Sequence, residues 1–479
     1  MVTRTRACLA GVALAAAVTG GCGTHDVGAA KSASSPPVTL GGWTYYGTGQ
    51  GLSAEVHDVS ADEGGNVYVA GGDALYAKAP MATRFGRFDA TNAGLTVNCD
   101  DMSEIMNPFP TKPFYLCPVI SVAGAAPGRA VVGLKGLDQS ADLGSTWIFK
   151  TGGADVVSFE AAAGTVSRIR HVEIGSPPHI VCGASGEVNT GTCASPTDYW
   201  WIWGRRLLRQ VFRIVVNHDK STAMYGDAWF GGNHGTFAAL LANAGARGWT
   251  DRTAGWDPDQ WADAKDVWEH LHPAISAGGA FLLGQSWALS LDPRSGTPWG
   301  SSTIRTAYVV GYGPSLAGKN WWDMGPATPA AYLDLWPDSG DVWSGPTNDH
   351  VKSMSHCPDG TLWIASTTHG LAKIDPSGAI SFPSLPGPAV NAGASAIACD
   401  ASDGSVWIGL VQGGVLRLRG GAFEVMDPPG APEFAHHPVA SIQIDAWSKQ
   451  RVVYFAFAPS RDAAGDVVAA GGVGAYGSK

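Results

Sequence analysis

The sequence predicts an all-β fold built from repeated four-stranded antiparallel sheets. The first observation is a recurring pattern of turn, apolar strand, Gly-rich turn and apolar strand, at residues 65–78, 360–375 and 404–418. The second is the period, because Trp363 and Trp407 lie 44 residues apart, which suits one blade of a β-propeller and is too long for a leucine-rich repeat. The third is the content of 64 glycines and 19 tryptophans, typical of many tight turns with aromatic side chains between sheets.

Weaker copies of the central strand are expected elsewhere in the chain. Trp229 aligns with Trp407, and Leu282 takes the same place in residues 279–292. Alternating small and β-branched residues bounded by Gly, Asp and Pro indicate short antiparallel strands. Because one strand can mimic another, we predict a single propeller of eight blades, with seven as the alternative. The weaker strand cores are residues 131–133, 180–182, 309–311 and 453–455.

The two ends of this domain are expected to pair. Residues 41–53 have the pattern of an outer strand with the linker that precedes a blade, whereas no such strand follows residues 466–476. Pairing of the N-terminal strand with the last blade would close the ring and remove an open sheet edge. Residues 41–479 are therefore predicted to form one β-propeller domain.

The N-terminus has the features of an export signal. Arg4 and Arg6 precede a short apolar run at residues 7–18, which is too short to span a bilayer. Two glycines then precede Cys22, which resembles the bacterial lipobox, although Thr19 stands where that pattern usually has Leu.

This resemblance implies a lipoprotein signal peptide at residues 1–21 and acylation of Cys22. Residues 22–40 are small, polar and Pro-containing, which predicts a flexible tether. Gly23 after the cysteine implies, by the same resemblance, the outer membrane or cell surface. A periplasmic or secreted protein is the alternative.

Composition indicates which partners are expected. The chain has 31 basic and 41 acidic residues, a formal net charge of −10, and only 15% charged residues. Nucleic acid is not an expected partner, because phosphate backbones are bound by clustered Lys and Arg. No later stretch has about 18 to 20 uninterrupted apolar residues, so membrane contact is expected through the lipid anchor alone. We expect a monomer without a cofactor.

Six cysteines remain after the signal peptide and the anchor are set aside. An even number in an exported chain suggests disulfides. The two local pairs, Cys99 with Cys117 and Cys182 with Cys193, would each add about 3 kcal/mol on the chain-entropy model. A third bridge requires the Cα atoms of two first strands to come within about 7 Å. The alternative is that some cysteines stay as small buried apolar side chains. The third pair is Cys357 with Cys399.

Two stretches resemble known propeller families. Residues 43–76 resemble the two-component-regulator type of propeller repeat, and residues 350–418 repeat that pattern. Residues 140–147 fit the Asp-box of sialidase-like and sortilin-like propellers, where the motif is structural. The resemblance implies a carboxylate that accepts turn amides, a glycine that permits the turn and an aromatic ring beneath the hairpin. These Asp-box positions are Ser140, Asp142, Gly144 and Trp147.

Residues 266–273 form the sharpest polar cluster in the sequence. On a strand, Trp268, His270 and His272 project to one face, where they are candidates for ligand binding. Asp227 or His234 would be needed to complete a metal site, but the sequence fixes no third ligand, so we assign no metal. The alternative is that these side chains line the rim of the central tunnel or an apolar pocket.

Aromatic side chains in the poorly repetitive segments favour a binding function. Such segments project as loops, and planar rings on a rigid face stack on sugars or anchor a partner protein. We therefore predict a binding or scaffold module for a protein, peptide or glycan. These aromatic residues are Trp200, Trp201, Trp203, Trp256, Trp261, Trp321 and Trp322.

The alternative is a polysaccharide hydrolase or lyase with its site at the central tunnel. The sialidase resemblance implies arginines, a Tyr with a Glu, and acidic residues converging on the axis. Residues 212–214 weakly resemble the arginine motif of that family, but Val215 stands where Pro is usual. Converging Tyr, Glu and several Arg in a deep cleft would favour the enzyme, and a filled axis would favour binding.

Overall fold

The structure is a computed structural model. It describes residues 35–72, 74–96, 119–135, 137–140, 147–150, 153–172, 180–182, 187–189, 210–222, 225–232, 235–240, 287–296, 298–301, 307–309, 332–333, 335–336, 351–387, 393–447 and 451–477. The expected signal peptide and the anchor residue Cys22 lie outside these residues. None of the helices within them is long and apolar enough to span a membrane.

The described residues are nearly all β-structure, in seven antiparallel sheets of three to five strands and a few two-stranded hairpins. This confirms the prediction of several four-stranded antiparallel sheets. The first strand of each sheet is β3 (Asp58–Ala61), β7 (Val119–Gly124), β15 (Val211–Val216), β18 (Leu289–Leu291), β22 (Val351–His356), β26 (Ala394–Cys399) or β30 (Val439–Asp445). The second strands, in the same order, are β4 (Val67–Gly71), β8 (Arg129–Leu134), β16 (Asp227–Gly232), β19 (Pro298–Gly300), β23 (Leu362–Ser366), β27 (Val406–Leu410) and β31 (Val452–Phe457).

The remaining strands complete the sheets outward. The third strands are β5 (Ala74–Lys78), β11 (Ala154–Glu160), β17 (Gly235–Leu240), β20 (Ala307–Val309), β24 (Gly370–Ile374), β28 (Val415–Arg419) and β34 (Gly472–Tyr476). The outer strands are β6 (Gly86–Phe88), β12 (Thr165–Val172), β21 (Tyr332–Leu333), β25 (Ile380–Ser381), β29 (Ala422–Val425) and, in the sheet of β30, β2 (Trp43–Tyr46) with β1 (Val38–Leu40). Outside the sheets lie the hairpins β9 (Leu137–Ser140) with β10 (Trp147–Lys150), β13 (Ile180–Cys182) with β14 (Glu187–Asn189) and β32 (Ser460–Arg461) with β33 (Val467–Ala469), the helix α1 (Ala90–Ala93) and the 3-10 turns η1 (Thr48–Gln50) and η10 (Glu433–His436).

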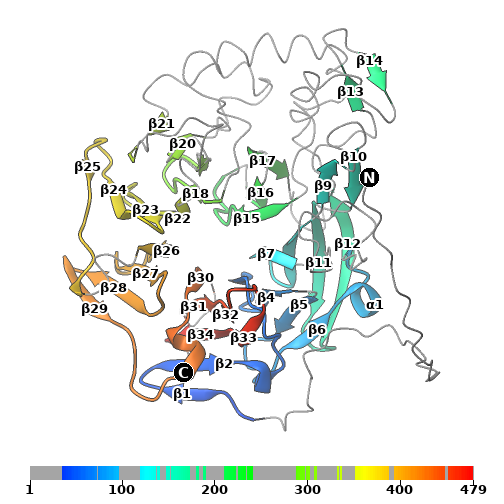
Figure 1. Ribbon diagram of the computed structural model, residues 1–479, viewed down its shortest axis with the longest axis horizontal. Coiled ribbons are helices and arrows are strands. Elements are labelled where there is room, and N and C mark those ends of the chain that lie inside the picture. The colour runs from blue at the N-terminus through cyan, green and yellow to red at the C-terminus, as the bar shows by residue number, and fades with distance from the viewer. Residues whose placement is uncertain are drawn as a thin grey trace, which may run out of the picture.

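The sheets are set around a common centre, with their first strands innermost (Figure 1). Each described first strand contacts the first strand of the next sheet, in the order β3, β7, β15, β18, β22, β26 and β30, and β30 in turn contacts β3. This is the radial arrangement of a β-propeller.

The second strands explain the apolar runs in the sequence. All residues of β4, β16, β23, β27 and β31 are buried. Each second strand lies between the sheets on either side of its own, so both of its faces are covered and both need apolar side chains. The outer strands β25 and β29 carry mostly exposed residues, because only one face of the sheet edge is covered.

Serine hydroxyls link neighbouring first strands, which share no backbone ladder. Each of these serines is on or beside the first strand of its sheet and binds a backbone group of the adjacent first strand. Five accept an N–H: Ser441 from Val59 (3.2 Å), Ser60 from Gly124 (2.9 Å), Ser290 from His356 (2.9 Å), Ser353 from Ile397 (3.1 Å) and Ser355 from Cys399 (2.9 Å). Two donate to a carbonyl: Ser121 to Val211 (2.6 Å) and Ser395 to Val439 (2.7 Å).

The first and last strands of the described chain lie in one sheet. Strand β2 pairs with β34 in the register Trp43 with Tyr476, and β34 pairs with β31. The ring of Trp43 lies 4.9 Å from Phe455 and 5.3 Å from Tyr476, so aromatic packing supports the ladder. The N-terminal segment therefore supplies the outer part of the last sheet.

The expected Asp-box falls on the hairpin of β9 and β10. The backbones of Ser140 and Trp147 are directly paired across this hairpin. Asp142 and Gly144 lie outside the described residues. The hairpin itself is an insertion between β8 and β11, which pair with each other.

One of the three expected disulfides lies within the described side chains. Cys357 and Cys399 are bonded, with their Cα atoms 5.2 Å apart. The bond links the ends of β22 and β26. Cys182 belongs to β13, and the other three cysteines, Cys99, Cys117 and Cys193, lie outside the described residues.

Candidate functional site

The two ends of the ring carry different groups of side chains. From one contact to the next between β3 and β7, the residue numbers of both strands rise together, and the same holds between β22 and β26. These first strands therefore run parallel to one another and finish at the same end. We call the end where the first strands finish the exit face, and the opposite end the start face.

Turns from three sheets meet at the centre of the exit face. Glu63 follows β3, His218 follows β15 and Trp447 follows β30. The Nδ1 atom of His218 lies 3.1 Å from Oε1 of Glu63, and its ring packs on Trp447 with the ring centres 3.8 Å apart and the planes tilted by 31°. Because the sheets of β15 and β30 are not neighbours, these contacts cross the axis. Lys220 and Tyr225 complete the group, which we call the axial cluster.

Local turn chemistry positions the three central residues. Asp62 accepts the N–H of Gly64 at 2.8 Å, and Asn217 accepts the N–H of Asp219 at 2.8 Å, so the residue between each pair is held at the tip of a tight turn. Asp445 accepts the N–H of Trp447 itself at 3.1 Å. Glu63 and His218 therefore occupy the same position of their repeats, one residue after the Asx residue, and Trp447 stands one residue further along its own turn.

Hydrogen bonds set the charge of the axial cluster. Burial alone would raise the pKa of Glu63, but bonds from His218, Lys220 and Tyr225 outweigh it and lower that pKa to about 2. Burial and the bond to Glu63 raise the pKa of Tyr225 to about 12. The Nζ atom of Lys220 is 2.7 Å from Glu63 and the hydroxyl of Tyr225 is 3.0 Å from it. At neutral pH the cluster thus holds a carboxylate and a protonated phenol.

Other side chains fill further parts of the interior near the axis. Arg213, from the weak arginine motif, reaches Asp58 of β3 with an N–O distance of 3.4 Å. On the start face, Phe212 and Trp287 are stacked at 3.8 Å, and the ammonium of Lys352 lies 3.6 Å from the centre of the Trp287 ring. These three residues come from or directly precede three different first strands.

A groove of about 650 Å³ opens on the exit face between the sheets of β22 and β26. One wall comes from the sheet of β22 and the other from the sheet of β26. The disulfided residue Cys357 lies at its inner end. The groove is lined by Cys357, Pro358, Asp359, Thr361, Trp363, Lys373, Ser381, Pro383, Ala401, Gly404, Val406, Leu418, Gly420, Gly421 and Phe423.

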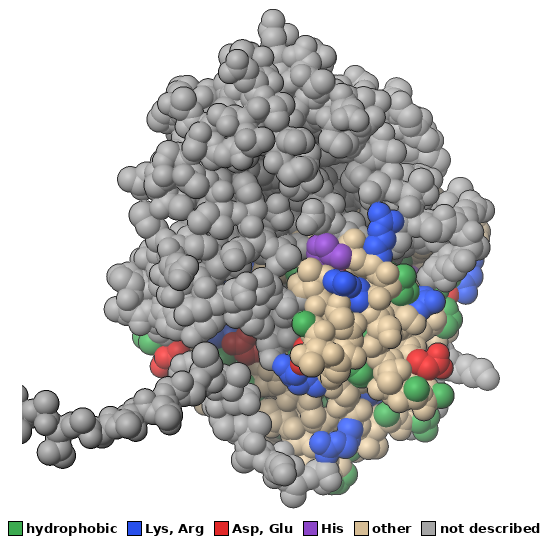
Figure 2. Space-filling model, turned by 90° about the vertical axis from the view of Figure 1, so that its right-hand side faces the viewer, with side chains coloured by type: hydrophobic (Ala, Val, Ile, Leu, Met, Phe, Trp, Pro, Cys, Tyr) green, Lys and Arg blue, Asp and Glu red, His purple; other side chains and the backbone are tan. Residues whose placement is uncertain are grey.

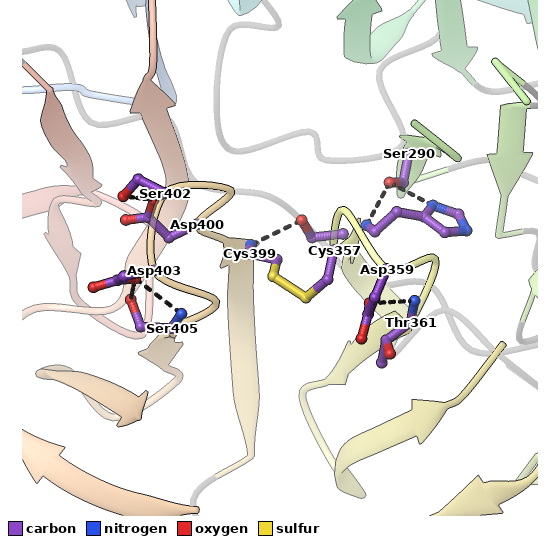
Figure 3. The surroundings of a disulfide bond; sticks show 11 residues. Ser290, Cys357, Asp359, Thr361, Cys399, Asp400, Ser402, Asp403 and Ser405 are labelled. Atoms are coloured by element: carbon purple, nitrogen blue, oxygen red, sulfur yellow. Dashed lines mark hydrogen bonds between the residues drawn. A yellow bond between two sulfur atoms is a disulfide. The ribbon is translucent and has the colours of Figure 1, made fainter. Parts of the chain in front are cut away.

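Asx turns fix the rims of this groove on both sides of the disulfide (Figure 3). Asp359 accepts the N–H of Thr361 at 2.8 Å. On the other side, Asp400 accepts the N–H of Ser402 at 2.9 Å, and Asp403 accepts that of Ser405 at 3.0 Å. Short turns locked by their own carboxylates give the groove a defined shape without a ligand.

The side of the molecule formed by β11 and β12 offers a contrast. The described part of this side carries separate Lys and Arg side chains, and hydrophobic side chains appear singly (Figure 2). Ile169 of β12 is exposed over 51% of its surface. Single exposed apolar residues are ordinary on a protein surface and mark no docking area.

The structure places only one of the residues predicted to bind a ligand. Asp227 begins β16 and is buried, with 3% of its surface exposed, and its carbonyl accepts the N–H of Asn217 at 2.8 Å. His234, Trp268, His270 and His272 lie outside the described residues. Within the part of the chain that the structure describes, no group of three or more His, Cys, Asp and Glu side chains is placed to hold a metal ion.

Sequence reasoning missed both the axial cluster and the groove. Glu63 and His218 do carry a local signal, since each follows an Asp or Asn at the end of a first strand. Aligning the repeats on that Asx residue would have put both side chains at the same end of the ring. The groove has no such signal, because its walls belong to two repeats.

No protein-family model matches the sequence, and no curated protein matches it. Among solved structures, the extracellular domain of the putative hybrid two component system BT3049 from B. thetaiotaomicron aligns over 91% of this chain with 11% identity and a TM-score of 0.47. The chain spans only 42% of that domain's length. Two further solved structures, Saccharomyces cerevisiae Sqt1 and YCF48 bound to D1 peptide, also align with most of the chain.

For Sqt1 the aligned share is 93% of this chain and 99% of Sqt1, with 10% identity and a TM-score of 0.44. For YCF48 it is 92% of this chain and 98% of YCF48, with 12% identity and a TM-score of 0.44. All three TM-scores are below 0.5. The evidence for the propeller arrangement is therefore the set of strand contacts within this chain. These likenesses identify no ligand.

Proposed function

We propose that this protein is an exported, lipid-anchored binding module of the cell envelope, whose ligand is a protein, peptide or glycan that docks on the exit face. One observation carries the proposal: a preformed groove lies on the exit face, between the sheets of β22 and β26, beside a centre crossed by the contacts of the axial cluster. A ligand that binds at this face would meet a shaped, partly aromatic surface held by rigid turns. Trp363 and Phe423 supply its aromatic part.

We further infer a closed ring of seven blades, the alternative count, in place of eight. Each described first strand contacts the next, and β30 contacts β3, so the circle offers no position for another blade. The pairing of β2 with β34 supports closure through the two chain ends. Such a closed ring has no open sheet edge and makes a rigid platform for loops and grooves.

The proposal includes a location in the cell envelope. Residues 1–21 would be removed, Cys22 acylated and residues 22–40 left as a tether to the outer membrane or cell surface. The Cys357–Cys399 disulfide supports export, since disulfides persist in oxidising compartments. With Cys22→Ser we expect the protein to leave the membrane fraction and to lose labelling by a radioactive fatty acid. Continued lipid labelling of this variant would contradict the anchor.

A hydrolase acting on polysaccharide is the second candidate, because Tyr225 and Glu63 form the Tyr–Glu pair that such a site needs. Two features weaken it. Glu63 accepts three donors and has a pKa of about 2, so it is a poor base at neutral pH. Tyr225 has a pKa of about 12 and stays protonated. Polysaccharide cleavage that is lost in Tyr225→Phe would establish the enzyme.

The binding function is tested with two probes, a glycan array and a phage-displayed library of random dodecapeptides, applied to the purified full-length protein. Ala401→Trp adds bulk on the exit face, and Gln412→Trp adds the same bulk to the same sheet at the β27–β28 turn, on the start face. Both parent residues are exposed. We expect a ligand that is lost with Ala401→Trp and kept with Gln412→Trp. No binding to either probe, or loss only with Gln412→Trp, would contradict the proposal.

A further inference from the structure

Among the described residues that line the groove, Lys373 is a cation without a carboxylate oxygen at ion-pair distance. Asp359 accepts the N–H of Thr361 and lies in the field of Arg294, and Asp403 is 2.6 Å from Arg417. Among the described residues, no Asp or Glu oxygen lies within ion-pair distance of Lys373, whose ammonium is 5.8 Å from the centre of the Trp363 ring. A partner with negative charge would therefore find an open site.

Asp375 is the acidic residue closest in sequence to this lysine, two residues further along the chain. It interacts with Lys373 only through space. Its Oδ1 atom already accepts hydrogen bonds from the N–H groups of Ser377 at 2.8 Å and Ala379 at 2.9 Å. The turn thus uses this carboxylate and leaves the ammonium to face the groove.

The two walls of the groove differ in side-chain size. The wall from the sheet of β22 carries Pro358, Trp363 and Pro383, whereas the other wall combines Val406, Leu418 and Phe423 with Ala401 and three glycines. The glycines have positive φ angles, and no atom lies within 4 Å of where a Cβ would stand on any of them. At these glycines no side chain separates the main chain of a ligand from the protein backbone, as in the binding of extended peptides. These glycines are Gly404, Gly420 and Gly421.

From these features we propose that the groove binds an extended segment of a partner protein, with an acidic side chain on Lys373 and a neighbouring apolar side chain against Trp363 and Phe423. This inference rests on the proposed binding function and names its ligand class. The volume of about 650 Å³ falls within the roughly 300 to 1,000 Å³ of ordinary ligand sites. The disulfide and the Asx turns hold both walls before the ligand arrives, which lowers the cost of ordering on binding.

The test uses the same dodecapeptide library with a charge reversal. We expect the full-length protein to enrich peptides with Asp or Glu beside an aromatic or large aliphatic residue. Lys373→Glu should weaken these peptides by about tenfold or more, and panning on this variant should instead enrich Lys or Arg. Arg84→Glu makes the same change in net charge at an exposed residue of another sheet and should leave binding unchanged.

The possible results distinguish failure of this inference from failure of the proposed binding function. Lys373→Gln, a milder change, should lose part of the affinity and all of the preference for acidic peptides, and it covers the case in which Lys373→Glu fails to fold. Peptides without an acidic preference, or with affinity equal in wild type and Lys373→Gln, overturn the inference. Binding to glycans but to no peptide overturns it while the binding function stands. No binding to either probe overturns both.

Discussion

Cys357 and Cys399 join the exit ends of β22 and β26, and their disulfide continues a ladder of hydroxyl contacts between the same strands. Ser353 accepts the N–H of Ile397 at 3.1 Å, and Ser355 accepts that of Cys399 at 2.9 Å. Cys357 is two residues further on, so its side chain projects to the same side of the strand. The covalent bond is thus the last step of a regular contact between two sheets.

Loss of this bond is expected to lower stability substantially. The bond spans 42 residues, and a loop of that length adds about 4 kcal/mol on the chain-entropy model. The double variant Cys357→Ala with Cys399→Ala should therefore unfold at lower temperature and lower denaturant concentration than the oxidised wild type. Calorimetry under non-reducing conditions measures this. An unchanged midpoint would show that the serine contacts alone hold the two sheets.

His356 is expected to make the protein sensitive to mild acid. Burial lowers the pKa of His356 to about 4, because a site shielded from water disfavours the charged ring. The Nδ1 atom of this ring lies 2.9 Å from the hydroxyl of Ser290. The unfolded chain takes up this proton near pH 6.5 and the folded chain only near pH 4, so stability falls as the pH drops between these values, by roughly 2 to 3 kcal/mol.

His356→Asn keeps a side chain that can hydrogen-bond with Ser290 but removes the titration. Urea unfolding of both proteins at pH 7 and pH 4 should show a smaller acid loss for the variant. Equal losses would mean that other groups carry the acid sensitivity.

The ionised carboxylate of Glu63 is expected to stabilise the folded protein through its contacts in the axial cluster. Its folded pKa of about 2 lies below the ordinary value of 4.5, so its contribution is complete above about pH 5 and is lost as the pH falls towards 2. Glu63→Gln keeps the shape but leaves Lys220 and His218 without a carboxylate, which should cost about 2 kcal/mol at pH 7. The gap between wild type and variant should shrink at pH 3, as measured by urea unfolding. A gap that is equal at both pH values would contradict the charge assignment.

The sequence allowed prediction of features that depend on neighbouring residues. The hairpins at residues 65–78, 360–375 and 404–418 appear as β4 with β5, β23 with β24, and β27 with β28. Their turns and apolar alternation depend only on residues adjacent in the sequence, so the sequence pattern is enough to predict these hairpins. The expected pairing partner for the first strand was also readable, because an outer strand stood alone at one end of the chain.

Contacts between sheets that are distant in the sequence could not be predicted from the repeats. Glu63 and His218 are 155 residues apart, and they meet only because the two sheets are two places apart around a narrow centre. The groove likewise depends on the angle between two neighbouring sheets, which no single repeat encodes.

The contact between the last two sheets is expected to depend on a glycine. A Cβ on Gly409 of β27 would stand 2.4 Å from the Cβ of Val439, the first residue of β30. Both positions are held by ladders on their own sheets, so neither can move far. Gly409→Ala should therefore destabilise the protein by about 1 to 3 kcal/mol through overpacking.

A double-mutant cycle tests whether this cost arises between the sheets. Val439→Gly alone removes a fully buried side chain and should also destabilise the protein. If the two residues meet as the structure shows, Gly409→Ala should cost less in the presence of Val439→Gly, because the added methyl then occupies the vacated space. Denaturant unfolding of the four proteins gives the coupling. Additive costs would mean that β27 and β30 are not packed together, and the proposed closed ring of seven blades would lose one of its supports.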